Sequence, residues 1–128
     1  MPVTVELTIE GKTYQVRRYY ITIEREDDEK GRPKSDPAWK IYVVIDSVSD
    51  NTVTNWMLDP KKLVDGKLGL YRIGDGSMLK EIEFKKSACT SLTDYFNIEH
   101  SFVTSYLVIS GKDIKINTAE LVQRWPGQ

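Results

Sequence analysis

The stretch Trp39-Lys40-Ile41-Tyr42-Val43-Val44-Ile45 decides the fold class of this chain of 128 residues. Every second side chain, beginning with Trp39, is apolar, and this period of two is typical of a β-strand with one face in a core. Tyr42 and Val44 make the opposite face apolar as well. We therefore expect a central strand that is covered on both faces.

The segments before this strand show the same period. Residues 3–9 alternate apolar and polar side chains, and Gly11-Lys12 indicates a short turn. After the turn, the apolar side chains stand on even positions up to Val16 and on odd positions from Tyr19. One inserted residue exchanges the two faces of a strand, so this slip predicts a β-bulge near Tyr19-Tyr20.

The second half of the chain predicts further strands joined by turns that contain glycine. We expect strands over residues 68–73, 78–84 with a less regular continuation over 85–97, 102–109 and a short return over 114–116. The turns are predicted at Gly74-Asp75-Gly76, which makes a hairpin, and at Gly111-Lys112-Asp113.

One short helix interrupts this pattern. Asp50 or Asn51 can cap its beginning, and Pro60 limits its continuation. Its apolar side chains fall at spacings of three and four and form one stripe, Val53, Trp56 and Met57. About seven strands with one helix predict a mainly β chain, a small β-barrel or sandwich. The length predicts a single domain over residues 1–128.

Composition limits the partners. The chain carries 18 basic and 19 acidic side chains, a net charge of -1. This balance gives no basic surface for nucleic acid or for an acidic membrane, so we expect protein or small-molecule partners. No signal peptide is readable, and no apolar run is long enough to span a membrane. We therefore expect synthesis in the cytoplasm without membrane insertion.

Groups that perform catalysis are scarce. His100 and Cys89 are the only histidine and the only cysteine, which excludes a multi-histidine metal site and a pair of zinc-binding thiolates. A Cys89/His100 nucleophilic pair stays open as one hypothesis, although a small apolar core residue is the simpler interpretation of Cys89. The carboxylate pairs Asp27-Asp28 and Glu81/Glu83 are expected on the surface. We predict no cofactor, no metal and no enzymatic activity.

Two further segments suggest contacts. Residues 24–30 contain five acids and two bases, and they continue into Gly31-Arg32-Pro33-Lys34-Ser35-Asp36-Pro37, so residues 24–37 predict a long exposed loop. Trp125 stands among the last four residues, where a chain end usually frays. It is therefore expected to dock on its own barrel or on that of a neighbour.

Several short segments, in this order, resemble the Hcp (haemolysin-coregulated) tube proteins of bacterial type VI secretion systems. They are Ile9-Glu10-Gly11-Lys12-Thr13-Tyr14, Gly31-Arg32-Pro33, Asn55-Trp56-Met57-Leu58-Asp59-Pro60, Phe84-Lys85-Lys86-Ser87-Ala88-Cys89, Thr104-Ser105-Tyr106-Leu107-Val108-Ile109-Ser110 and Trp125-Pro126. Each segment is short, but their order and spacing together are specific. The resemblance covers nearly the whole chain.

The resemblance implies a compact β-barrel of two packed antiparallel sheets with one short α-helix on its flank. It implies a structural protein that forms homohexameric rings, and rings that stack into a tube and carry or chaperone effectors. The implied partners are copies of itself, the spike at the tube tip, the sheath and effector proteins. It further implies export from the bacterial cytoplasm by the type VI apparatus, without a cleaved signal peptide.

The resemblance also assigns roles to residues. The loop from Gly31 to Pro37 (Gly31, Arg32, Pro33, Lys34, Ser35, Asp36 and Pro37) corresponds to the segment that reaches toward an adjacent ring. Trp56 and Met57, with Val53 in the same stripe, anchor the helix, and Trp125 and Pro126 dock the C-terminus. Two alternatives stay open: an Hcp-like or phage-tail-tube-like adaptor that binds a partner without polymerising, and the Cys89/His100 enzyme.

Overall fold

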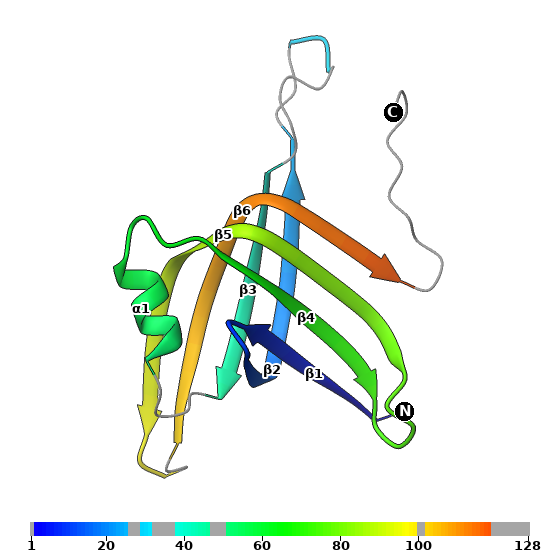
Figure 1. Cartoon of the computed structure of the whole chain (residues 1–128), viewed down its shortest axis with the longest axis vertical. Helices are drawn as coiled ribbons and strands as arrows, with labels where there is room; N and C mark the ends of the chain where they lie inside the picture. The colour runs from blue at the N-terminus through cyan, green and yellow to red at the C-terminus, as the bar shows by residue number, and fades with distance from the viewer. Residues whose placement is uncertain (1, 26–28, 32–37, 47–50, 100–101, 119–128) are drawn as a thin grey trace.

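The computed structural model describes residues 2–25, 29–31, 38–46, 51–99 and 102–118. The elements are β1 (Val3–Ile9), β2 (Lys12–Glu24), β3 (Ala38–Asp46), α1 (Thr52–Leu58), β4 (Val64–Arg72), β5 (Met78–Asn97) and β6 (Phe102–Thr118). The six strands close into an antiparallel barrel in the order β1-β2-β3-β6-β5-β4, with α1 beside β5 (Figure 1). The predicted mainly β barrel with one helix on its flank is therefore confirmed.

The two longest strands divide the barrel into two layers. β5 and β6 curve strongly (Figure 1) and pair with each other along almost their whole length, and each has a second neighbouring strand in one half only. β4 pairs with β5 only as far as Ser87, and β3 pairs with β6 only as far as Gly111. One side of the barrel is a sheet of four strands, which we call the four-stranded layer. It consists of residues 18–24 of β2, 38–46 of β3, 102–111 of β6 and 88–97 of β5.

One predicted turn is wrong. β6 runs without interruption through Gly111-Lys112-Asp113, so the described residues form six strands where about seven were expected. Gly111 lies opposite Ser87, and a Cβ atom on it would come within 2.8 Å of the Ser87 Cα atom. The glycine is therefore needed for the close approach of two strands and does not mark a turn.

The first hairpin and the bulge are both displaced from their predicted positions. The turn lies at Glu10-Gly11, where both residues have positive φ values of 48° and 76°, as a two-residue turn between twisted strands requires. The bulge in β2 lies at Arg17, between the pairs Val16–Ile45 and Arg18–Val44, and not at Tyr19-Tyr20. The predicted exchange of faces in β2 occurs at this bulge.

The core lies between the two layers. β3 contributes Trp39, Ile41, Val43 and Ile45, none of them more than 2% exposed. The described residues cover the other face of β3 only in part, since Tyr42 and Val44 are half-buried.

Helix α1 closes one side of the core. Val53 and Trp56 are buried, and Met57 packs against the core. The Trp56 Nε1–H donates a hydrogen bond of 3.0 Å to the Ser87 carbonyl oxygen, and its ring stacks on Phe84. Asn51 occupies the N-cap position without a capping hydrogen bond from its side chain, and Asp50 lies outside the described residues. Within the described ranges, no helix has the length and apolar character to cross a membrane.

Candidate functional site

The open face of the four-stranded layer is unusually aromatic. Its central rows are set by the strand register: Tyr20 lies opposite Tyr42, which lies opposite Val108, and Val44 lies opposite Tyr106. The Tyr20 and Tyr42 rings stack with their centroids 4.3 Å apart. We call this surface the tyrosine face and define it as Tyr20, Tyr42, Val44, Tyr95, Tyr106 and Val108. An open sheet face normally carries polar side chains, so an aromatic one is a candidate binding surface.

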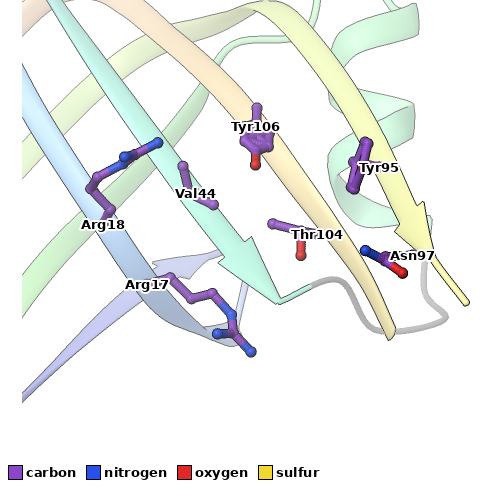
Figure 2. Close-up of a pocket in the computed structure, with 7 residues that line it drawn as sticks. All are labelled: Arg17, Arg18, Val44, Tyr95, Asn97, Thr104 and Tyr106. Atoms are coloured by element: carbon purple, nitrogen blue, oxygen red, sulfur yellow. The ribbon is translucent and has the colours of Figure 1, made fainter. Parts of the chain in front are cut away.

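One end of the tyrosine face is hollowed into a pocket of about 490 Å³, here called the arginine pocket. Four strands contribute its lining, which is Arg17, Arg18, Val44, Tyr95, Asn97, Thr104 and Tyr106 (Figure 2). Among the described residues, the lining contains two guanidinium groups, two phenols, a hydroxyl and an amide, but no carboxylate. Its polar groups therefore favour an anionic ligand.

The two arginines of the pocket differ in their partners. Arg17 Nε forms a salt bridge with the Asp46 carboxylate at the end of β3. Arg18 makes no hydrogen bond or ion pair with any residue that the structure describes, and its side chain is exposed. The free positive charge of the pocket is therefore that of Arg18.

The four-stranded layer also has two open edges. β1 pairs with β2 only as far as Gln15, and β4 pairs with β5 only as far as Ser87. In the described part of the chain, residues 17–24 of β2 and 88–97 of β5 therefore have a strand on one side only. The exposed apolar side chains on these edge strands are Tyr20 and Ile23 on β2 and Tyr95 and Phe96 on β5. Open edges of this kind are templates for pairing with another strand.

The structure places only some of the residues singled out in the sequence. Gly31 is exposed with φ 78°, whereas Arg32 to Pro37, Trp125 and Pro126 lie outside the described residues. The helix residues Val53, Trp56 and Met57 face the core and lie away from the tyrosine face. The arginine pocket was not predicted, because its lining comes from four strands and carries no local motif.

The chemical candidates behave as structural residues. Cys89 is buried, its thiol donates a hydrogen bond of 3.4 Å to the Ser91 carbonyl oxygen, and burial raises the pKa of that thiol. This environment disfavours the thiolate that a nucleophile needs. His100, Asp27 and Asp28 lie outside the described residues.

The remaining acidic groups form no metal site. The hydrogen bond with Glu83, and then burial, raise the pKa of Glu81, and both side chains are half-buried on β5. The described residues contain no group of three or more histidine, cysteine, aspartate or glutamate side chains that could hold a metal ion.

Comparison with solved structures supports one fold. Hcp1 from Flavobacterium johnsoniae is 22% identical, with a TM-score of 0.77 over 94% of this chain and 99% of that chain. Hcp1 from Salmonella typhimurium is 10% identical, with a TM-score of 0.73 over 94% and 89%. The sheath/tube terminator of PVC, an extracellular contractile injection system, is 12% identical, with a TM-score of 0.67 over 89% and 93%. This chain therefore has the fold of Hcp and of related tube proteins of contractile injection systems.

Comparison with family models supports the same assignment. No curated protein matches the sequence. The model described as Hemolysin coregulated protein Hcp (TssD) matches residues 1–126, nearly the full sequence. The resemblance inferred from the short ordered segments is thereby confirmed. The chain belongs to the Hcp (TssD) family of structural tube proteins.

Proposed function

We propose that this protein forms homohexameric rings that stack into the inner tube of a type VI secretion system and carry or chaperone effectors. The observation that carries the proposal is the match of the Hcp family model over residues 1–126. The fold adds weight, because structures of a sheath-tube complex and of a tube-terminating cap share it with TM-scores of 0.61 and 0.58.

The two open edges of the four-stranded layer support ring formation. They lie on opposite sides of the layer, one on β2 and one on β5. Contact between the β2 edge of one copy and the β5 edge of the next is heterologous, because two different surfaces meet. Repetition of such a contact closes a ring when the rotation between copies divides a full turn, and no edge then stays open.

We further propose that the tyrosine face lines the channel of this ring, and the shape of the barrel supports this. The other face of the four-stranded layer packs on the core, with the second layer and α1 beyond it. The outer circumference of a ring is longer than the inner one, so the bulkier side of each subunit belongs outside. The tyrosine face then lines the lumen, where it is available to cargo.

The remaining parts of the proposal follow from the family. The proposed partners are copies of this chain, the spike at the tube tip, the sheath and effector proteins. We propose that the protein resides in the bacterial cytoplasm before the type VI apparatus exports it. In this role the chain is a structural subunit and not an enzyme.

Measurement of absolute mass tests the ring. Size exclusion with light scattering at several protein concentrations, with negative-stain images of the peak, should give about 88 kDa for six copies of the 14.7 kDa chain. Ring-shaped particles are expected in the images. A folded monomer at every concentration would contradict the ring and favour the adaptor that binds a partner without polymerising.

A pair of variants tests which surface closes the ring. Ile23→Lys places a charge on the open edge of β2 and should yield a folded 14.7 kDa monomer, because lysine on an edge strand opposes pairing. Met78→Lys changes a similarly exposed apolar residue that lies off both open edges, and it should leave the ring intact. Equal masses for the two variants would contradict the edge contact.

A further inference from the structure

Strand β2 changes its neighbour at a single bulge. The strand pairs with β1 before this bulge and with β3 from Val16 onward. In the β2–β3 ladder Val16 lies opposite Ile45, and the next pair is Arg18 opposite Val44, so Arg17 is the extra residue. A bulge bends its strand and changes the direction of the strand edge. The open edge of β2, which the proposed ring contact uses, therefore begins at this bulge.

The apolar pattern of β2 allows two positions for the bulge. Val16 is buried and Tyr19 packs against the core, so two residues stand between two positions that face inward. Regular alternation has one residue there, so one of the two is extra. Arg17 and Arg18 are both charged and both exposed, and burial therefore favours neither of them as the bulged residue. A further interaction is needed to select Arg17.

The salt bridge between Arg17 and Asp46 can make this selection. The Arg17 Nε atom contacts the Asp46 carboxylate, and in Figure 2 the Arg17 side chain extends toward the end of β3. Backbone pairing of β2 with β3 ends at Ile45, so side chains make this last contact between the two strands. The two side chains are 50% and 37% exposed, so the pair adds little to the free energy of unfolding. Its geometry, more than its energy, is what distinguishes Arg17 from Arg18.

We propose that the Arg17–Asp46 salt bridge is a positioning contact, which selects Arg17 as the bulged residue and so sets the start of the β2 edge for the ring. A bulge moved by one residue would place Arg17 opposite Val44 and leave Arg18 as the extra residue. The backbone groups at the start of the edge would then point in other directions, and a different arginine would face the channel. The proposal rests on the proposed function, because this edge is used only when copies join.

The position of the bulge can be measured without the ring. In the Ile23→Lys background, which is expected to be monomeric, cross-strand nuclear Overhauser contacts should join Arg18 to Val44. Asp46→Ala removes the carboxylate and should add contacts from Arg17 to Val44, because the bulge then samples both positions. Contacts from Arg18 alone in the Asp46→Ala variant would overturn the proposal.

The effect on assembly is measured on the full-length chain. Dilution with light scattering gives the protein concentration at which half of the rings dissociate. Asp46→Ala should raise this concentration by about threefold or more, because every contact of the ring loses the same salt bridge. Asp113→Ala is the matched control, since it removes an exposed aspartate on β6 away from both open edges, and it should leave the concentration unchanged. Equal values for the two variants would overturn the role in assembly.

Exchange of the two charges separates positioning from a direct role of Arg17 in the ring contact. Arg17→Asp alone should weaken the ring, and its combination with Asp46→Arg should restore it, because the salt bridge is rebuilt with the opposite polarity. A double variant as weak as Arg17→Asp would overturn the proposal. A wild-type chain that forms no ring would instead contradict the proposed function, and the measurement of the bulge would still decide the role of the salt bridge.

Discussion

The two faces of the four-stranded layer come from the same strands but have different surroundings. On the core face Ile41, Val43 and Ile109 are at most 1% exposed, whereas on the tyrosine face Tyr20 is 53% and Tyr106 is 39% exposed. A strand with one open face usually carries polar side chains there. The aromatic open face therefore contributes little to the barrel itself, and its composition fits the channel surface that we propose for it. The comparison separates residues that stabilise the fold from residues that the proposed function places in the channel.

The largest effect on the core is expected at Trp56. Trp56→Ala removes a buried ring that stacks on Phe84 and a hydrogen bond to the Ser87 carbonyl oxygen. Loss of a buried aromatic side chain costs about 3–5 kcal/mol in the free energy of unfolding. This loss is measured by denaturant unfolding of the Ile23→Lys variant, which is expected to be monomeric, with and without Trp56→Ala. Trp56→Phe is the control: it keeps most of the packing and leaves one carbonyl unpaired, at a cost of about 1–3 kcal/mol.

A pair of neighbouring substitutions tests the comparison most directly. Ile41→Ala empties part of the core and should cost about 2–5 kcal/mol. Tyr42→Ala removes the stacking contact with Tyr20 on the open face and should cost about 0.5–1.5 kcal/mol. Urea unfolding of both variants in the same monomeric background gives the two values. Equal losses would mean that the tyrosine face stabilises the single barrel as strongly as the core does.

A smaller loss of stability is expected from a substitution at Gly111, where the two layers meet. Gly111→Ala brings a Cβ atom to within 2.8 Å of the Ser87 Cα atom, so a strand must shift. We expect a loss of about 1–3 kcal/mol in the free energy of unfolding. The double variant with Ser87→Ala removes the Oγ atom but not the Cα atom, so it should recover only part of the loss. Unchanged stability of Gly111→Ala would contradict the close approach of β5 and β6.

The smallest effect is a dependence of stability on pH at Cys89. Burial raises the pKa of its thiol, so the native state retains a proton that the unfolded state loses first. The contribution of the Cys89 thiol to the free energy of unfolding is complete below the ordinary thiol pKa of about 8.5. It falls as pH rises above that value, by at most about 1.4 kcal/mol per pH unit. Urea midpoints between pH 7.5 and 9.5 measure this slope. Cys89→Ala should have a shallower slope, and identical slopes would contradict burial of the thiol.

Much of the fold could be predicted from the sequence, because the strands alternate with a period of two wherever one face is buried. The exposed second face of β3 and the role of Gly111 could not be predicted, since both depend on neighbouring strands that are distant in sequence. The sequence Gly111-Lys112-Asp113 is typical of a turn, and only the approach of Ser87 explains why the strand continues. The weak pattern in residues 85–97 has a similar cause, because the register between β5 and β6 shifts between Cys89 and Ser91.

The candidate site was less predictable than the fold. The bulge at Arg17 places two consecutive arginines beside the same pocket, and periodicity indicates that a bulge exists without fixing its residue. The pocket also needs Tyr95 and Thr104, which lie about eighty residues further along the chain. The one signal available was the apolar second face of β3, since Tyr42 and Val44 would be out of place on a face open to water.

The position of β6 in the barrel has a consequence for folding during synthesis. This last strand lies between β3 and β5 and pairs with both, while β1 at the other end of the chain pairs with β4. The barrel therefore cannot close until almost the whole chain has left the ribosome, although the β1–β2 hairpin can form at once. Contacts so distant in sequence slow folding, and closure of the barrel must wait for the synthesis of β6. Each barrel is thus completed only after all the strands before β6 have been exposed without their final partners.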